Sequence, residues 1–199
     1  MMPWEHVFVG YISYSLFVHA VYRGAPASDE TLVVGFASLL PDLIDKPLAW
    51  GLGTFSSGYA VAHSIFFALT LAITVGALAS SRDRPRIGWA FGVAYLLHLK
   101  TDVLSKFLFD GELRLDVILW PIHSGGDGYE RGFTEEFAVN ISEYFGWISR
   151  EVTSNDPDPY LFFVLGIGIV GMMLWVYDGM PVGREAFRTV RRVVRAFGP

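Results

Sequence analysis

Long hydrophobic runs with few charges dominate this sequence and predict membrane-spanning helices. The runs 59–79 and 160–177 contain no charged residue, the run 4–22 contains one, and the run 87–109 is interrupted by three. A helix that crosses the hydrocarbon core of a bilayer needs about 20 predominantly apolar residues. The runs 59–79, 87–109 and 160–177 qualify directly as spanning helices, and the run 4–22 nearly does.

A fifth run, residues 31–40, is too short to span a bilayer by itself. It reaches spanning length if the helix continues through 41–45 toward Trp50. Pro41 is expected to start a turn in this stretch, and a broken span is tolerated where its backbone lines a protein-enclosed cavity. The five runs together predict an all-α, multi-pass transmembrane helical bundle.

Arginine placement predicts the orientation of these segments. The loop 81–86 and the tail 183–196 are rich in Arg, which places both in the cytoplasm by the positive-inside rule. The N-terminus then lies outside, and so does the acidic segment 110–159. Within that segment, 117–122 is expected to be interfacial or re-entrant, and 133–148 is expected to be an amphipathic helix on the membrane.

The same reasoning predicts one membrane-embedded domain over residues 1–199. It consists of a four-segment core (1–109), an extracytoplasmic segment (110–159), and a last span with a basic cytoplasmic tail (160–199). The expected location is the inner or plasma membrane, with the lipid bilayer as the principal partner.

Composition supports this prediction. Charged residues make up 18% of the chain, whereas a soluble domain carries about a quarter. The net charge of −5 and the lack of a basic stripe argue against a nucleic-acid partner. The chain has no cysteine, which excludes disulfides, thiolate metal sites and cysteine nucleophiles.

Six ionisable residues are predicted to lie at one level, near the outer ends of four different segments. Ionisable side chains at membrane depth are costly, so each needs a partner or a function. His98 and Asp102 are four residues apart and therefore project from one helical face. The six residues are His6, Asp42, Asp45, His63, His98 and Asp102.

Imidazole and carboxylate groups together suit a divalent metal, zinc first, with manganese or iron as alternatives. His63, His98 and Asp102 would hold the ion with Asp42 or Asp45. The carboxylate that does not bind the metal would act as general base, so both aspartates are catalytic candidates as well as metal-ligand candidates.

His6 is expected to assist the other ligands, and His123 is a candidate substrate contact, although a plain loop histidine is the simpler interpretation. Structural interpretations remain open for the rest. In these interpretations His63, taken singly, is a packing residue, and His98 with Asp102 form a buried hydrogen-bonded couple. Asp42 and Asp45 are then interfacial turn residues partnered by Lys46.

The chain resembles the family of inner-membrane, predicted metal-dependent hydrolases of bacteria and archaea, which is distantly similar to zinc-dependent phospholipase C. The resemblance covers roughly residues 1–122. The matching positions, in order, are His6, Leu40-Pro41-Asp42 with Asp45, His63-Ser64, His98 with Asp102, and Leu119-Trp120-Pro121.

Two departures from the family pattern stand out. The acidic motif reads Pro41-Asp42-Leu43-Ile44-Asp45-Lys46, one residue longer than usual and without its histidine, and Gly58-Tyr59-Ala60 replaces a His-Arg-Gly. The resemblance implies a membrane-bound metal-dependent hydrolase.

A site at the outer interface would meet lipid headgroups, so a lipid or another phosphoester is the expected substrate. Two alternatives remain. In one, the protein is not an enzyme, and a structural metal or polar cluster holds the helices together. In the other, which the apolar inner halves of 59–79 and 160–177 disfavour, it is a transporter.

Overall fold

A computed structural model describes residues 1–123, 131–187 and 190–191, so part of the predicted basic tail (188–189 and 192–199) lies outside the described residues. The described chain contains helices and no strands, which confirms the all-α class. The elements in order are α1 (Pro3–Tyr22), α2 (Ser28–Lys46), the π-helical turn η1 (Pro47–Gly51), α3 (Ile65–Ser80), α4 (Pro85–Asp110), the 3₁₀ turn η2 (Leu115–Ile118), α5 (Phe133–Thr153) and α6 (Pro159–Tyr177).

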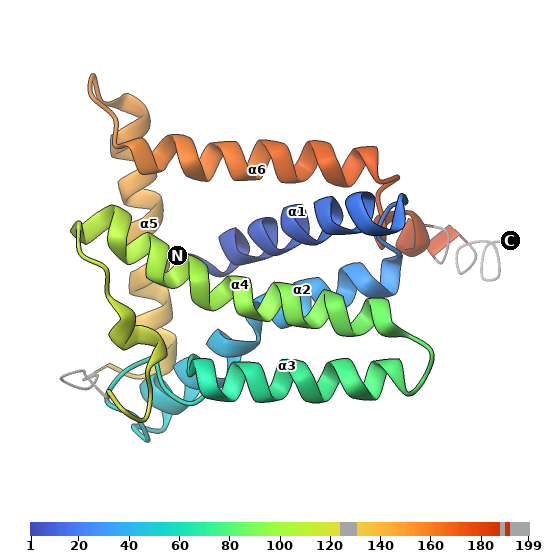
Figure 1. The fold of residues 1–199 in the computed structure, drawn as a ribbon. Coiled ribbons are helices and arrows are strands. Elements are labelled where there is room, and N and C mark those ends of the chain that lie inside the picture. The colour runs from blue at the N-terminus through green and yellow to red at the C-terminus, as the bar shows by residue number, and fades with distance from the viewer. Residues whose placement is uncertain (124–130, 188–189, 192–199) are drawn as a thin grey trace, which may run out of the picture.

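Helix α4 is the centre of the bundle. It packs against α1, α2 and α3, while α6 packs on the other side of α1. Figure 1 shows these five helices running side by side, with α5 crossing them at the end where the N-terminus lies. Helix α5 contacts η1 and α6, so it covers one end of the bundle.

The buried side of α2 carries the acidic motif. Its buried residues recur every three or four positions, which places them on one helical face. Pro41 lies inside the helix and does not start the predicted turn, because packing of this face against α1 and α4 outweighs the one backbone hydrogen bond that proline removes. Asp42 and Asp45 therefore stay on the buried face. The full set is Glu30, Val34, Ala37, Ser38, Pro41, Asp42 and Asp45.

Helix α3 begins at Ile65, later than the hydrophobic run suggests. His63 therefore lies in a turn before the helix, although the run 59–79 predicts that it lies inside the helix. The Asp45 carboxylate accepts hydrogen bonds from the backbone N–H groups of Ala60, Ala62 and His63. These bonds satisfy the backbone of the turn without helix formation, and hydropathy does not reveal them.

Close helix contacts depend on small residues. A Cβ atom added at Gly88 on α4 would lie 2.8 Å from the Cα of Gly76 on α3, and one at Gly171 on α6 would lie 2.7 Å from the Phe8 ring on α1. Small residues let helix backbones approach closely.

Two buried carboxylates link α6 to α1 through hydrogen bonds, one near each end of this helix pair. Glu5 accepts hydrogen bonds from Tyr160 on α6 and Tyr144 on α5. Asp178, just after α6, accepts from the Tyr11 hydroxyl at 2.6 Å and lies 2.7 Å from His19 Nε2. Burial, followed by the bond to Glu5, raises the pKa of Tyr144, so its hydroxyl stays protonated and donates at neutral pH.

Within the described chain, α6 is the one helix that is both long and apolar enough to cross a bilayer by itself. Helix α3 is equally apolar in character but has 16 residues. Helices α2 and α4 carry the charged residues of the polar cluster, which lowers their hydropathy. The number of spans therefore stays a prediction.

Candidate metal centre

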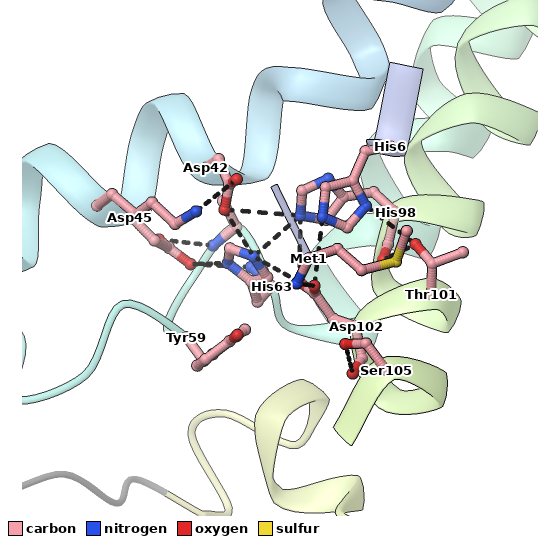
Figure 2. A network of polar contacts seen from close by, with 12 residues as sticks. Met1, His6, Asp42, Asp45, Tyr59, His63, His98, Thr101, Asp102 and Ser105 are labelled. Carbon is pink, nitrogen blue, oxygen red and sulfur yellow. Dashed lines mark hydrogen bonds and ion pairs between the residues drawn. The ribbon is translucent and has the colours of Figure 1, made fainter. Parts of the chain in front are cut away.

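Four elements bring all six predicted site residues to the end of the bundle that α5 covers (Figures 1 and 2). The side chains are withdrawn from solvent: His63 and Asp45 are 0% exposed, and Asp42 is the most exposed at 7%. The residues come from α1 (His6), α2 (Asp42 and Asp45), the turn before α3 (His63) and α4 (His98 and Asp102).

The three imidazole rings are each anchored through Nδ1. His63 Nδ1 lies 2.8 Å from Asp45 Oδ2, and His98 Nδ1 lies 2.7 Å from the carbonyl oxygen of Ser38. Both partners accept hydrogen bonds, so each Nδ1 donates a proton, and each Nε2 is the ring nitrogen that faces the cluster.

His6 is anchored in the same way. Its Nδ1 lies 2.9 Å from Thr101 Oγ1, whose own proton is directed to the backbone carbonyls of Leu97 and His98. The threonine oxygen is thus an acceptor for His6, and His6 Nε2 is left without a proton. This atom is buried and has no hydrogen-bond partner among the described residues.

The three Nε2 atoms converge on two carboxylates. The Nε2 atoms of His63 and His98 lie 3.1 Å apart, and Asp102 Oδ2 lies 3.4 and 3.3 Å from them. Asp42 Oδ1 is 3.5 Å from His63 Nε2 and 3.8 Å from His98 Nε2. His6 Nε2 is 3.3 Å from Asp102 Oδ1. Two imidazole lone pairs at 3.1 Å repel each other unless a proton or a metal cation lies between them.

These distances fit a metal centre. Ligand atoms bound to tetrahedral zinc at about 2.0–2.1 Å lie roughly 3.3 Å from one another, close to the spacings observed here. Two groups of three ligand atoms share His98, one with His6 and Asp102 and the other with Asp42 and His63. The donor set of three imidazole nitrogens and two carboxylates could therefore hold a divalent ion, and the orphaned His6 Nε2 supports this.

Asp45 lies behind His63, apart from this donor set. Its Oδ2 receives His63 Nδ1 and two backbone N–H groups, and its Oδ1 receives the N–H of Ala62. Both oxygens are thus occupied in holding the turn and the His63 ring. Carboxylates in this position orient a metal-binding histidine and raise its basicity.

Asp42 has a different environment from Asp45. Its Oδ2 accepts a hydrogen bond from Lys46 Nζ at 2.6 Å, while its Oδ1 faces His63 and His98. Asp42 also borders a cavity of about 450 Å³ that lies between the start of α1, the end of α2, α4 and α5. We call this the site cavity. Its lining is Met1, Met2, Pro3, Trp4, Leu39, Asp42, Leu43, Lys46, Pro47, Trp50, Gly58, Tyr59, Lys106, Phe133, Glu136, Phe137, Asn140 and Ile141.

The other predicted contacts fall as follows. His123 is exposed and does not line the site cavity. Ser64 Oγ donates a hydrogen bond to the carbonyl oxygen of Trp120, so the His-Ser and Leu-Trp-Pro motifs are in direct contact. The backbone nitrogen of Met1 lies 3.6 Å from Asp102 Oδ1, and Figure 2 shows the two residues together.

Sequence reasoning missed the residues that anchor the rings. Thr101 is next to Asp102 in the sequence, yet its hydroxyl gave no motif, and Ser38 contributes a backbone carbonyl that any residue type would provide. The buried stripe of α2 was the signal that could have placed Ser38 near the acidic motif.

A family model described as YdjM inner membrane protein matches residues 1–180. The chain belongs to this family. The match to the YdjM family includes all six site residues and every helix from α1 to α6, and it makes the chain a member of an inner membrane protein family. Comparisons with curated proteins and with solved structures gave no match.

Proposed function

We propose that this protein is a membrane-embedded, metal-dependent hydrolase that acts on a phosphoester, a lipid above all, at the outer membrane interface. The observation that carries the proposal is the convergence of three imidazole Nε2 atoms on two carboxylates beside the site cavity. The resemblance to predicted metal-dependent hydrolases points the same way.

His6, His63, His98 and Asp102 would hold the ion, with Asp42 as a further ligand or as the base. When bound, a divalent ion, zinc before manganese or iron, supplies Lewis-acid chemistry that polarises a phosphoryl oxygen and acidifies water. The Nδ1 bonds of the three histidines keep their Nε2 lone pairs aimed at this point.

Asp42 is the general base in this proposal, because it borders both the donor set and the site cavity. Its carboxylate takes a proton from the attacking water as the water oxygen bonds to phosphorus. The phosphorus–oxygen ester bond then breaks, and the proton passes from Asp42 to the leaving oxygen. Asp45 takes no proton here and acts as a positioning residue for His63.

The test is metal analysis of detergent-purified protein, followed by a lipid phosphodiesterase screen. Wild type should retain about one divalent ion per chain, and the double variant His98→Ala with Asp102→Ala should lose it. If wild type and the double variant carry equally little metal, the hydrolase proposal is wrong.

Asp42→Asn separates an enzyme from a structural cluster. We expect this variant to elute as folded protein and to lose turnover by about 10²–10⁴-fold, the usual contribution of a general base. A structural metal or polar cluster would instead give a variant that fails to fold while no hydrolysis is detected in the wild type.

A further inference from the structure

The site cavity is lined by two lysines, and the metal centre does not explain both of them. Lys46 from α2 and Lys106 from α4 both line it, although the chain as a whole has a net charge of −5. These are two of the three lysines in the protein.

Lys46 is held in place. Its Nζ donates to Asp42 at 2.6 Å and lies 5.6 Å from the centre of the Trp50 ring. A divalent ion at the candidate metal centre would match the two negative charges of Asp42 and Asp102, which leaves the positive charge of Lys46 available to an anionic ligand.

Lys106 is half-buried, and no described carboxylate forms an ion pair with it. The other acidic residue on the wall of the site cavity, Glu136, faces Arg131 at 3.5 Å. A lysine that lines a largely apolar cavity, with no counter-ion among the described residues, favours a ligand that brings a negative charge.

The remaining wall is apolar and comes partly from α5. Its contributors include Trp4, Leu39, Leu43, Phe133, Phe137 and Ile141. The α5 members recur at helical spacing, so one face of this amphipathic helix forms a side of the site cavity. The volume of about 450 Å³ lies within the range of about 300–1,000 Å³ typical of small-molecule sites.

We infer that the site cavity binds the headgroup of an anionic phospholipid, with Lys106 and Lys46 contacting its negative charge and the α5 face covering the first part of its acyl chains. This inference rests on the proposed function, because it assigns the substrate of the same site. It also identifies Lys106 as the residue that selects anionic over zwitterionic headgroups.

The test measures binding, not turnover. Dihexanoyl phosphatidylglycerol and dihexanoyl phosphatidylcholine, which have equal acyl chains, are titrated into metal-loaded protein in maltoside micelles by calorimetry. Wild type should prefer phosphatidylglycerol by about tenfold, and Lys106→Gln should abolish that preference.

Lys100→Gln is the matched control. Lys100 lies on the same helix but faces a groove with Val9, Leu97 and Phe163, away from the site cavity. The Lys100→Gln variant should keep the preference for phosphatidylglycerol. Wild type, Lys106→Gln and Lys100→Gln should all hold the same amount of metal. Lys46 is not used because its substitution would also disturb Asp42.

The inference is overturned if wild type binds both lipids equally, if Lys100→Gln loses the preference as Lys106→Gln does, or if Lys106→Gln loses its metal. A preference that depends on Lys106, in a protein that hydrolyses neither lipid, upholds the lipid site and refutes the hydrolase.

Discussion

At the residue scale, two aspartates three positions apart have different roles because their surroundings differ. Both carboxylate oxygens of Asp45 accept hydrogen bonds, from the backbone of the turn before α3 and from the His63 ring. Asp42 keeps one oxygen toward the imidazoles and shares the other with Lys46. Thr101 is not one of the candidate ligands, but its hydroxyl oxygen fixes the His6 ring.

Thr101→Val is expected to weaken metal binding without unfolding the protein. Valine preserves the shape of the side chain but removes the acceptor for His6 Nδ1, and loss of such a partner typically costs about 10–100-fold in metal affinity. The measurement is the metal dissociation constant by competition with a chelator, together with the elution profile in detergent.

Thr74→Val provides the control. Thr74 donates to a carbonyl one turn earlier in its helix, as Thr101 does, but it is exposed on α3. An equal loss of affinity in both variants would show that Thr101 has no specific role at His6.

At the element scale, the helices are held together by close approach as well as by hydrophobic burial. Gly88 on α4 packs directly on the Gly76 backbone, whereas a Cβ atom at Gly92, one turn further along α4, would meet the Ala72 side chain at an ordinary 3.8 Å. This difference distinguishes a glycine that the helix pair needs from one that it tolerates.

Gly88→Ala should lower the free energy of unfolding by about 1–3 kcal/mol, the usual cost of overpacking. Gly92→Ala should leave it unchanged or raise it by up to about 1 kcal/mol, because alanine favours the helix. The measurement is the midpoint of thermal unfolding of each variant in detergent, detected as loss of the folded protein's elution peak. Equal midpoints would mean that α3 can shift away from α4 at little cost.

At the scale of the whole molecule, the position of the metal centre relative to the membrane depends on orientation. The α3–α4 loop and the α5–α6 connection lie at opposite ends of the bundle in Figure 1. The first contains the basic stretch 81–86 that the positive-inside rule places in the cytoplasm. The candidate metal centre lies at the other end, with α5.

The lack of native cysteine allows a direct test of this orientation. Ser81→Cys and Ser154→Cys place single thiols in exposed connections at the two ends. In intact cells, a membrane-impermeant maleimide should label the second variant and spare the first, and both should react after the membrane is opened. If only Ser81→Cys is labelled in intact cells, the orientation is the reverse of the proposed one, and the site lies at the cytoplasmic interface.

The family-level motifs and the candidate ligands could be predicted from the sequence, because the relevant information is local. Uncharged runs of sufficient length indicate membrane helices, and the four-residue spacing of His98 and Asp102 reflects the periodicity of a helix. Isolated His and Asp residues are conspicuous in such apolar runs. The boundaries of α1, α4 and α6 follow the hydrophobic runs closely for the same reason.

The sequence determined the helical class and the six residues that gather at one end of the bundle. The tertiary structure decided what each does: that α2 continues through Pro41, that His63 lies in a turn, that Asp45 supports His63, and that the cavity contains Lys46 and Lys106. Helix packing decides the course of α2 and the lining of the cavity, and hydrogen bonds to backbone amides decide the places of His63 and Asp45. Every residue type except proline carries the same backbone N–H and C=O groups, so their partners emerge only when distant segments pack together.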